Sequence, residues 1–417
     1  MPTDAAHAAM STREVLRFGP VRALMVASFV LFTGTALQAA ALGLQAYNIS
    51  GREADLGWIG LCEFLPAAAL VLVTGSVADR FDRKKVALLA IGGEVVCSVA
   101  LLLFALTDPT EVWPLFIIAV GYGVARAFLA PSTRPMPAMV APEGGLPRVV
   151  AMWSATWTGA TILGPAASGL LFAVHPSLAY GVSTSMIMLA GVLIASLHFV
   201  RQPERPAADD KPTFRSAIEG LVFVRRTPIL LAAIGLDLFA VLFGGAVALL
   251  PAIAEDRLGV GDVGYGFLRA APGAGAALMA VFLAFRPLKR HIGRNLLYAV
   301  LVFGAATVAL GLTRSYVVAF AALVVLAGAD MISVFIRGSL VPLVTPDEKR
   351  GRVMAVENVF IGASNELGAF ESGIVAQAVG TPATVIGGGI ATIVVVGVWW
   401  LGFPSLRRVD RFEDLGH

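Results

Sequence analysis

Residues 65–91 read LPAAALVLVTGSVADRFDRKKVALLAI, two apolar runs separated by a short loop that carries four basic residues. Neither run shows the polar face that a helix on the surface of a soluble protein needs. A helix of about 20 apolar residues is long enough to cross the hydrocarbon core of a bilayer. This stretch therefore predicts two membrane-spanning helices that are joined by a basic loop on one side of the membrane.

The composition of the whole chain agrees with this stretch. Of its 417 residues, 57% are hydrophobic and only 14% are charged, whereas a soluble domain carries about 25% charged residues. The mean hydropathy is +0.81. The net charge of +3 is small and the basic residues form no nucleic-acid patch, so we expect no nucleic-acid partner. Cys62 and Cys97 lie in apolar runs and are predicted to be packing residues, without a disulfide or a metal site.

Apolar runs of spanning length recur along the chain and predict an all-α membrane protein of twelve transmembrane helices. They fall near residues 21–46, 56–77, 86–107, 112–131, 147–173, 178–200, 228–251, 262–285, 295–313, 316–340, 352–378 and 382–403. Lys and Arg are concentrated in every second segment between the predicted spans. With a cytoplasmic N-terminus, 24 of the 31 Lys and Arg residues lie in cytoplasmic segments and three in outer loops. Because cytoplasmic loops are enriched in Lys and Arg, both termini are predicted to be cytoplasmic.

The second half of the sequence repeats the first. A shift of 206 places Gly60-x-x-Glu63-x-x-Pro66 on Gly266-x-x-Arg269-x-x-Pro272, and a shift of 204 places Ser168-Gly169 on Ser372-Gly373. We therefore predict two pseudo-symmetric six-helix halves, residues 1–200 and 228–417, joined by a cytoplasmic linker at 201–227 that includes an amphipathic helix on the membrane surface. Parallel repeats of this kind place a binding site near the bilayer midplane, between halves that rock against each other.

The loop Gly75-Ser-Val-Ala-Asp79-Arg80-Phe-Asp82-Arg83-Lys-Lys resembles the signature loop of the major facilitator superfamily. Together with the segment from Asn365 to Gly373, it is similar to the branch of enterobactin-type siderophore exporters and macrolide efflux proteins. The resemblance implies the major facilitator fold and a cytoplasmic gate that includes Gly75, Asp79, Arg80 and Arg83. Asp79 would lie at the positive end of the eleventh span and hold the cytoplasmic side shut.

A second motif, Gly164-Pro165-Ala-Ala-Ser168-Gly169, resembles a sequence that is found in exporters rather than importers. Two interpretations stay open for Gly164, Pro165 and Gly169. They could set the direction of transport, or they could form a kinked helix that packs closely against its neighbours.

Charged residues within spans need a partner, a wet cavity or a function, because each costs about 2.5–3.5 kcal/mol at the centre of a bilayer. Asp237 has no basic residue within two turns on its own span and is predicted to be a lone, proton-carrying carboxylate. The repeat relates Glu63 to Arg269 and Arg126 to Asp330. These charges could balance one another in one shared cleft, or each could pair within its own half.

Polar residues of the first and eleventh spans are further candidates for a cleft. Gln38 and Gln45 lie seven residues apart, as do Asn358 and Asn365. Glu366 and Glu371 are also candidates, although at 100° per residue they cannot both point into the same space.

These observations predict a proton-coupled exporter of small amphipathic organic molecules, of the drug or antibiotic class, in a bacterial inner membrane. A siderophore exporter is the alternative, and a non-transporting receptor or scaffold is the alternative of another class. No ATP-binding loop and no catalytic constellation is present in the sequence, so we expect neither an ATP-driven pump nor an enzyme, and no cofactor. The expected partners are the substrate, protons and membrane lipid, with the protein as a monomer.

Overall fold

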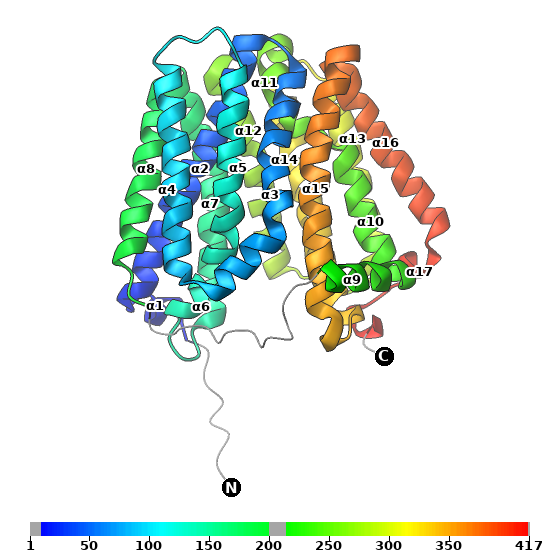
Figure 1. Cartoon of the computed structure of the whole chain (residues 1–417). Helices are drawn as coiled ribbons and strands as arrows, with labels where there is room; N and C mark the ends of the chain where they lie inside the picture. Colours follow the sequence, from blue (N-terminus) through cyan, green and yellow to red (C-terminus); the bar gives the residue numbers. More distant parts are fainter. Residues whose placement is uncertain (1–9, 200–213, 416–417) are drawn as a thin grey trace. The chain divides into compact units, whose positions relative to one another are not determined.

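The computed structural model describes residues 10–199 and 214–415, and every regular element within them is helical (Figure 1). Twelve of these helices have sixteen residues or more: α2 Gly19–Ser50, α3 Glu53–Arg80, α4 Arg83–Ala105, α5 Trp113–Thr133, α7 Leu146–Phe172, α8 Pro176–Ser196, α10 Pro228–Phe243, α12 Gly261–Phe285, α13 Ile292–Leu312, α14 Tyr316–Val344, α15 Asp347–Val379 and α16 Thr381–Gly402. The shorter ones are α1 Thr12–Val15, α6 Met136–Val140, α9 Phe214–Arg226, α11 Leu250–Ala252 and α17 Pro404–Arg407, with the 3-10 segments Gly245–Leu249 and Phe412–Leu415 and a π-helical segment, Ile253–Leu258.

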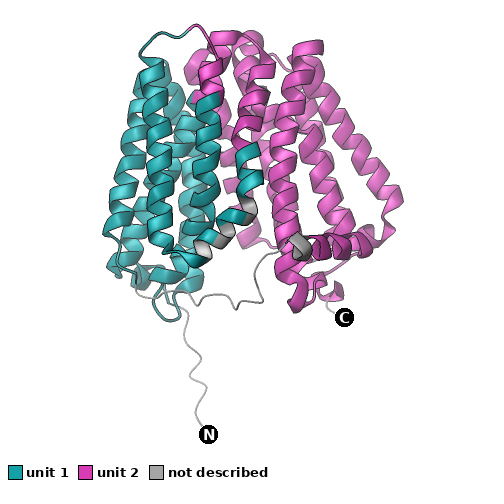
Figure 2. Cartoon of the chain, viewed as in Figure 1, with its two compact units in different colours: residues 1–41, 65–109, 117–211 teal, residues 42–64, 110–116, 212–417 magenta. Residues whose placement is uncertain are grey.

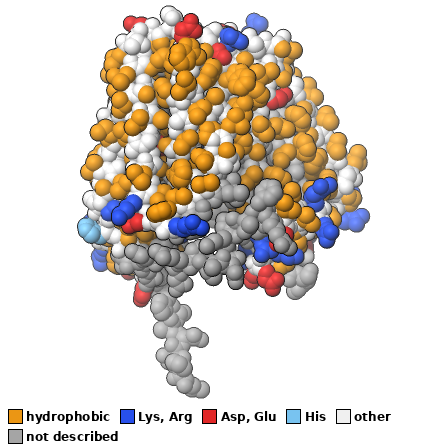
Figure 3. All heavy atoms as spheres, viewed as in Figure 1, with side chains coloured by type: hydrophobic (Ala, Val, Ile, Leu, Met, Phe, Trp, Pro, Cys, Tyr) orange, Lys and Arg blue, Asp and Glu red, His pale blue; other side chains and the backbone are white. Residues whose placement is uncertain are grey.

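Within the described residues, nine helical stretches are long and apolar enough to cross a membrane. The long helices α3, α7 and α15 fall outside this set. On the face seen in Figure 3, hydrophobic side chains cover most of the described surface, and Lys and Arg lie mainly near its upper and lower edges. Such a surface suits hydrocarbon, so the prediction of an all-α, multi-pass membrane protein is confirmed.

The chain divides into two compact units (Figure 2). Unit 1 comprises residues 1–41, 65–109 and 117–211, and unit 2 comprises residues 42–64, 110–116 and 212–417. The last part of α2 and the first part of α3 thus belong to unit 2. The predicted division at residues 200 and 228 is based on the sequence repeat, whereas the two units are groups of residues that contact one another in space. Of the predicted linker, residues 201–213 lie outside the described part of the chain, and α9 with Thr227 forms the remainder.

Related helices pack together in both units. In unit 1, α4 packs along α8, and in unit 2, α13 packs along α16. A shift of 204 to 206 residues carries the first pair onto the second, so the repeat that is visible in the sequence corresponds to a repeated helix pairing.

Asp82 explains how the basic loop after α3 ends. Its carboxylate accepts hydrogen bonds from the backbone N–H groups of Lys84, at 2.8 Å, and Lys85, at 3.3 Å, and so caps the N-terminus of α4. Aspartate is one of the preferred residues at this position because it satisfies N–H groups that have no partner within the helix.

The seventh span is less regular than the predicted run over 228–251. Helix α10 ends at Phe243, and the chain continues through a 3-10 segment, α11 and a π-helical segment to Leu258. A side chain at Gly245 would place its Cβ only 2.4 Å from the carbonyl oxygen of Gly368. Glycine at this position therefore lets the break in the seventh span lie directly against α15.

Candidate functional site

Three charged side chains from three helices meet inside unit 2. Arg337 of α14 forms an ion pair with Asp237 of α10, with Nη2 and Oδ1 2.8 Å apart, and another with Glu357 of α15, with Nη1 and Oε1 3.2 Å apart. The side chains of Arg337 and Asp237 are only 4% and 7% exposed. A third donor group of Arg337, Nε, lies 3.4 Å from the hydroxyl of Ser333.

Apolar neighbours surround this ion-pair group. Leu236 and Ile336, adjacent in sequence to Asp237 and Arg337, belong to one buried hydrophobic cluster with Val356, the neighbour of Glu357. In such surroundings an isolated charge is very costly, and a pair is tolerated only when its geometry is good and its other donors are satisfied. The two carboxylates and Ser333 meet that requirement around Arg337.

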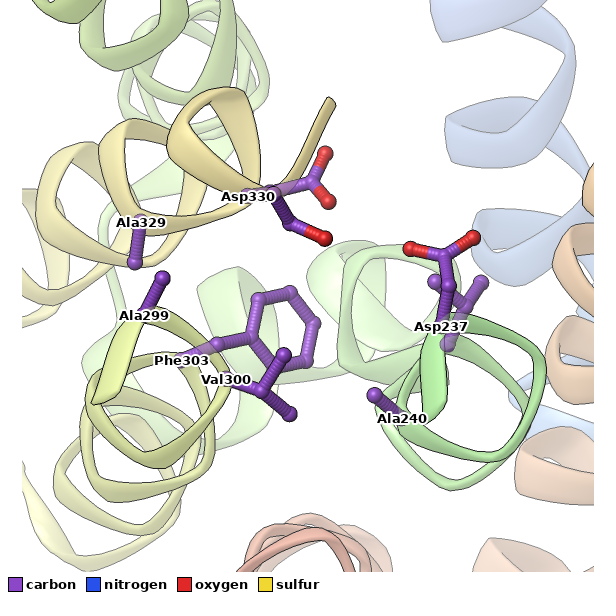
Figure 4. Close-up of a pocket in the computed structure, with 9 residues that line it drawn as sticks. Asp237, Ala240, Ala299, Val300, Phe303, Ala329 and Asp330 are labelled. Atoms are coloured by element: carbon purple, nitrogen blue, oxygen red, sulfur yellow. The ribbon is translucent and has the colours of Figure 1, made fainter. Parts of the chain in front are cut away.

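Asp330 adds a third carboxylate to the same region. It lies seven residues before Arg337 on α14, and it is within electrostatic reach of both Asp237 and Arg337. A small cavity lies between Asp237 and Asp330, and its other walls are mostly apolar (Figure 4). They are formed by Ala240, Val241, Ala299, Val300, Phe303, Ala329 and Ser333. Unlike Asp237, Asp330 keeps some accessible surface. We call Asp237, Asp330, Arg337 and Glu357 the charge cluster.

The charge cluster corrects one sequence prediction. Asp237 is not a lone carboxylate, because α14 brings Arg337 to it from one hundred residues further along the chain. The sequence does contain a signal for Arg337, namely a basic residue within a span, but a sequence cannot show which of several carboxylates such a residue reaches. Asp330 also has its charged neighbours within unit 2, which favours pairing within one half over balance in a shared cleft for this residue.

Other predicted residues of unit 2 are not members of the charge cluster. Glu63 of α3 and Arg269 of α12 are both partly buried. Gln45 of α2 is 3% exposed, and its Oε1 atom has no hydrogen-bond partner within the described residues. Glu366 and Glu371 are partly buried on α15, and Glu371 accepts a hydrogen bond from the hydroxyl of Ser372 at 3.5 Å.

Asn358 and Asn365 are exposed on α15, and each donates its side-chain amide to the backbone carbonyl four residues earlier, at 2.8 Å. These bonds use only the amide nitrogens, and a cleft-lining role for the two residues stays a prediction.

In unit 1, Gln38 is 1% exposed and accepts a hydrogen bond from the Ser183 hydroxyl at 3.1 Å. It is part of the core of its unit. The guanidinium carbon of Arg126 lies 5.6 Å from the centre of the Tyr122 ring, a cation–π arrangement.

The exporter-type motif lies at a close contact between helices of unit 1. A Cβ atom at Gly164 would lie 2.7 Å from the Cβ of Ala36 and 2.9 Å from the backbone nitrogen of Leu37, so α7 touches α2 here. Pro165 and Gly169 are buried in the same helix. This close contact supports the packing interpretation of the motif.

The predicted cytoplasmic gate is described only in part. The surroundings of Gly75 and of the Asp79 side chain lie outside the described part of the structure. Arg80 is exposed at the end of α3, and Arg83 begins α4.

The sequence prediction missed a glycine contact between α3 and α15 in unit 2. A Cβ atom at Gly373 would lie 2.8 Å from the carbonyl oxygen of Glu53 and 2.9 Å from the nitrogen of Gly57, and one at Gly57 would lie 2.9 Å from the carbonyl oxygen of Phe370. The Trp58 and Phe370 rings pack edge to face beside it, with their centres 5.0 Å apart. Small residues at helical spacing were the available signal, but chains of apolar helices contain many such pairs.

Long apolar helices around a buried charge cluster define a polytopic membrane transporter, because intramembrane charges of this kind mark pathways for ions and substrates. The family model described as Major Facilitator Superfamily matches residues 24–341. The chain belongs to this superfamily.

Among curated proteins, the chain is similar to the multidrug efflux pump Tap of Mycolicibacterium fortuitum, with 23% identity over 94% of this chain and 97% of Tap. The enterobactin exporter EntS of Escherichia coli O1:K1 / APEC is 23% identical over 93% of this chain and 92% of its own. An uncharacterized MFS-type transporter of Bacillus subtilis, YfiS, is 27% identical, and the match spans 66% of this chain and 63% of YfiS.

Solved structures agree on the fold. A point mutant of the nucleoside transporter NupG superimposes with a TM-score of 0.75 and 12% identity, over 92% of this chain and all of NupG. A bacterial homolog of the human lysosomal transporter Spinster, in an inward-facing and unoccupied conformation, gives a TM-score of 0.69 and 15% identity over 93% of this chain and 95% of its own. At these identities the likeness concerns the fold alone.

Proposed function

We propose that the protein exports small amphipathic organic molecules and that protons drive the export through the charge cluster. The observation that carries this proposal is the imbalance of charge within the cluster. Asp237, Asp330 and Glu357 share the single guanidinium of Arg337, so the fully ionised cluster holds two negative charges in excess. Inside a membrane protein, such an excess is relieved when a carboxylate takes up a proton.

Asp330 is the carboxylate we assign to the moving proton. Arg337 contacts Asp237 and Glu357 directly, and these ion pairs hold both carboxylates in place. Asp330 borders the same cavity as Asp237 but, unlike Asp237, keeps some accessible surface through which a proton can reach it. Proton uptake there lowers the negative charge beside Asp237 and changes the balance of forces among α10, α14 and α15. A conformational equilibrium shifts only through such a differential interaction.

Export of drug-like compounds is supported by the relatives. Tap and EntS, which are named for efflux and export, match the chain along nearly its whole length. We therefore also propose, as for a bacterial efflux protein, that the chain lies in the inner membrane with both termini in the cytoplasm, and that it acts as a monomer.

A siderophore exporter is the second candidate. The match to the enterobactin exporter covers 93% of this chain, whereas the match to the macrolide efflux protein A of Streptococcus pyogenes covers 50%. The full-length match favours a siderophore over a macrolide, but it does not separate a siderophore from the substrates of Tap.

The test has two stages. Cells with and without the gene are first exposed to a panel of macrolides, other antibiotics, cationic dyes and a catecholate siderophore, and reduced accumulation identifies a transported compound. The purified protein is then reconstituted in vesicles, and transport of that compound is measured under an imposed pH gradient, with a trapped pH-sensitive dye reporting proton movement.

We expect Asp330→Asn to abolish pH-driven transport and substrate-linked proton movement, while substrate exchange at equal pH continues. Ser339→Ala is the matched control, since it removes a polar side chain of the same helix that lies outside the charge cluster and the cavity and bonds to the carbonyl of Phe335, so it should leave proton coupling intact. Wild-type proton coupling in Asp330→Asn would contradict the assignment.

A further inference from the structure

Helix α9 presents a mixed apolar and basic stripe on its exposed side. Ile218 and Val222 are 45% and 40% exposed, and Arg225 and Arg226 are exposed as well. At 100° per residue these four positions fall within an arc of about 100° on one side of the helix. The stripe is therefore one continuous surface, with two aliphatic side chains beside two guanidinium groups.

The opposite side of α9 is fixed to the body of unit 2. Val224 is 1% exposed and packs in one hydrophobic cluster with Val353 and Val356 of α15. A Cβ atom at Gly220 would lie 2.8 Å from the carbonyl oxygen of Arg352. The guanidinium of Arg352 also pairs with Glu219 at 2.7 Å. Because the contacts of Gly220 and Val224 occupy the inner side, the stripe faces outward and is available to an external partner, and Glu219 at its edge is neutralised by Arg352.

Two observations indicate what that partner is. Within the described part of the chain, neither Arg225 nor Arg226 forms an ion pair, so both guanidinium groups are available to an anion. Pro228 begins the membrane-spanning helix α10, so these arginines lie within three residues of a span. In Figure 1, α9 lies across the ends of the long helices of its unit. Aliphatic side chains beside arginines at this level match the boundary between acyl chains and phosphate headgroups.

We propose that the stripe of α9 is a binding surface for anionic phospholipid, with Arg225 and Arg226 on the headgroup phosphates and Ile218 and Val222 at the acyl boundary. Arginine suits this task because its planar guanidinium group can hold two phosphate oxygens at once. Since the other side of α9 is joined to the start of α15, bound lipid stabilises the docked position of both helices.

The test uses the full-length protein, purified in a neutral detergent. Thermal unfolding is followed while phosphatidylglycerol or phosphatidylcholine is added in mixed micelles. We expect phosphatidylglycerol to raise the unfolding temperature of the wild type in a saturable way that high salt suppresses, and phosphatidylcholine to have little effect. Each basic residue near an anionic surface contributes about 1 kcal/mol, so Arg225→Gln with Arg226→Gln should need about thirtyfold more phosphatidylglycerol for the same response.

Two further variants make the result specific to α9. Lys289→Gln with Arg294→Gln removes the same charge from two other exposed residues, one between α12 and α13 and one in the first turn of α13, and this variant should respond as the wild type does. Arg225→Lys with Arg226→Lys keeps the charge and should retain most of the response. The proposal is overturned if the glutamine variant of α9 responds like the wild type, if the control variant loses as much, or if phosphatidylcholine or inorganic phosphate acts as well as phosphatidylglycerol.

Discussion

Helix α15 meets its neighbours in two contrasting ways. At Glu357 the contact is electrostatic, because Arg337 joins that carboxylate to Asp237 across three helices. Sixteen residues later the contact is steric, because Gly373 and Gly57 have no side chains to keep the backbones of α15 and α3 apart. One helix thus combines a contact that protonation can alter with a contact that no change of charge can alter.

The difference has a functional meaning. An ion pair in apolar surroundings is strong when complete and very unfavourable when one partner is lost, so its energy depends steeply on protonation. A glycine contact gains its energy from dispersion between closely packed atoms, and that energy falls off when the helices move apart by a fraction of an ångström. Protonation can therefore change the energy of the charge cluster, whereas the energy of the glycine contact depends only on how far apart the two helices lie.

The largest effect is expected from Arg337→Gln, which removes the basic member of the charge cluster. Asp237 and Glu357 would then face each other without compensation, and the variant should lose about 3–5 kcal/mol of stability. Thermal unfolding of the purified protein measures the loss. A double variant, Arg337→Gln with Asp237→Asn, should recover a large part of it. A single variant as stable as the wild type would show that the ion pairs contribute nothing to folding.

A smaller effect is expected at the glycine contact. In Gly373→Ala the new methyl group meets backbone atoms of Glu53 and Gly57 at less than 3 Å, so the helices must separate, at a cost of about 1–3 kcal/mol. Gly362→Ala is the matched control on the same helix, since a Cβ atom there meets no other atom within 4 Å. Because alanine has a higher helix propensity than glycine, the control variant should be as stable as the wild type or slightly more stable. Equal melting temperatures for the two variants would contradict the close contact.

The smallest effect is expected at Asp410, whose charge contacts are exposed, unlike those of the buried charge cluster. Asp410 accepts a hydrogen bond from the backbone N–H of His291 at 3.0 Å, and its carboxylate also lies 3.3 Å from Arg290. The His291 hydrogen bond, followed by the charge of Arg290, lowers the pKa of Asp410 below the ordinary value of 3.8.

A carboxyl group whose pKa is lower in the folded state stabilises that state at pH values above its unfolded-state pKa. This stabilisation is lost as the pH falls through the folded-state pKa. Unfolding temperatures recorded from pH 6 down to the acid limit of the preparation should therefore decline slightly less steeply for Asp410→Asn than for the wild type. Parallel curves would show that Asp410 has no part in the acid sensitivity.

The sequence alone was sufficient for the fold class and for the superfamily. Apolar runs of spanning length can be counted without coordinates, because a bilayer accepts only helices whose backbone groups are satisfied within the chain. The loop from Gly75 to Lys85 indicated the superfamily, to which the chain indeed belongs. Asp237 and Asp330 could also be selected as candidates from the sequence, since a carboxylate within a span carries a large energetic cost.

The partners of those carboxylates required the tertiary structure. Asp237 and Arg337 are one hundred residues apart, and which helix faces reach each other depends on how α10, α14 and α15 pack, not on any local pattern. The same is true of Gly57 and Gly373, which are two among 44 glycines in the chain. Local sequence determines which segments enter the membrane because hydrocarbon acts on each segment separately. Pairing between distant segments is decided only when the helices pack, since its energy arises from atoms that the chain brings together in space.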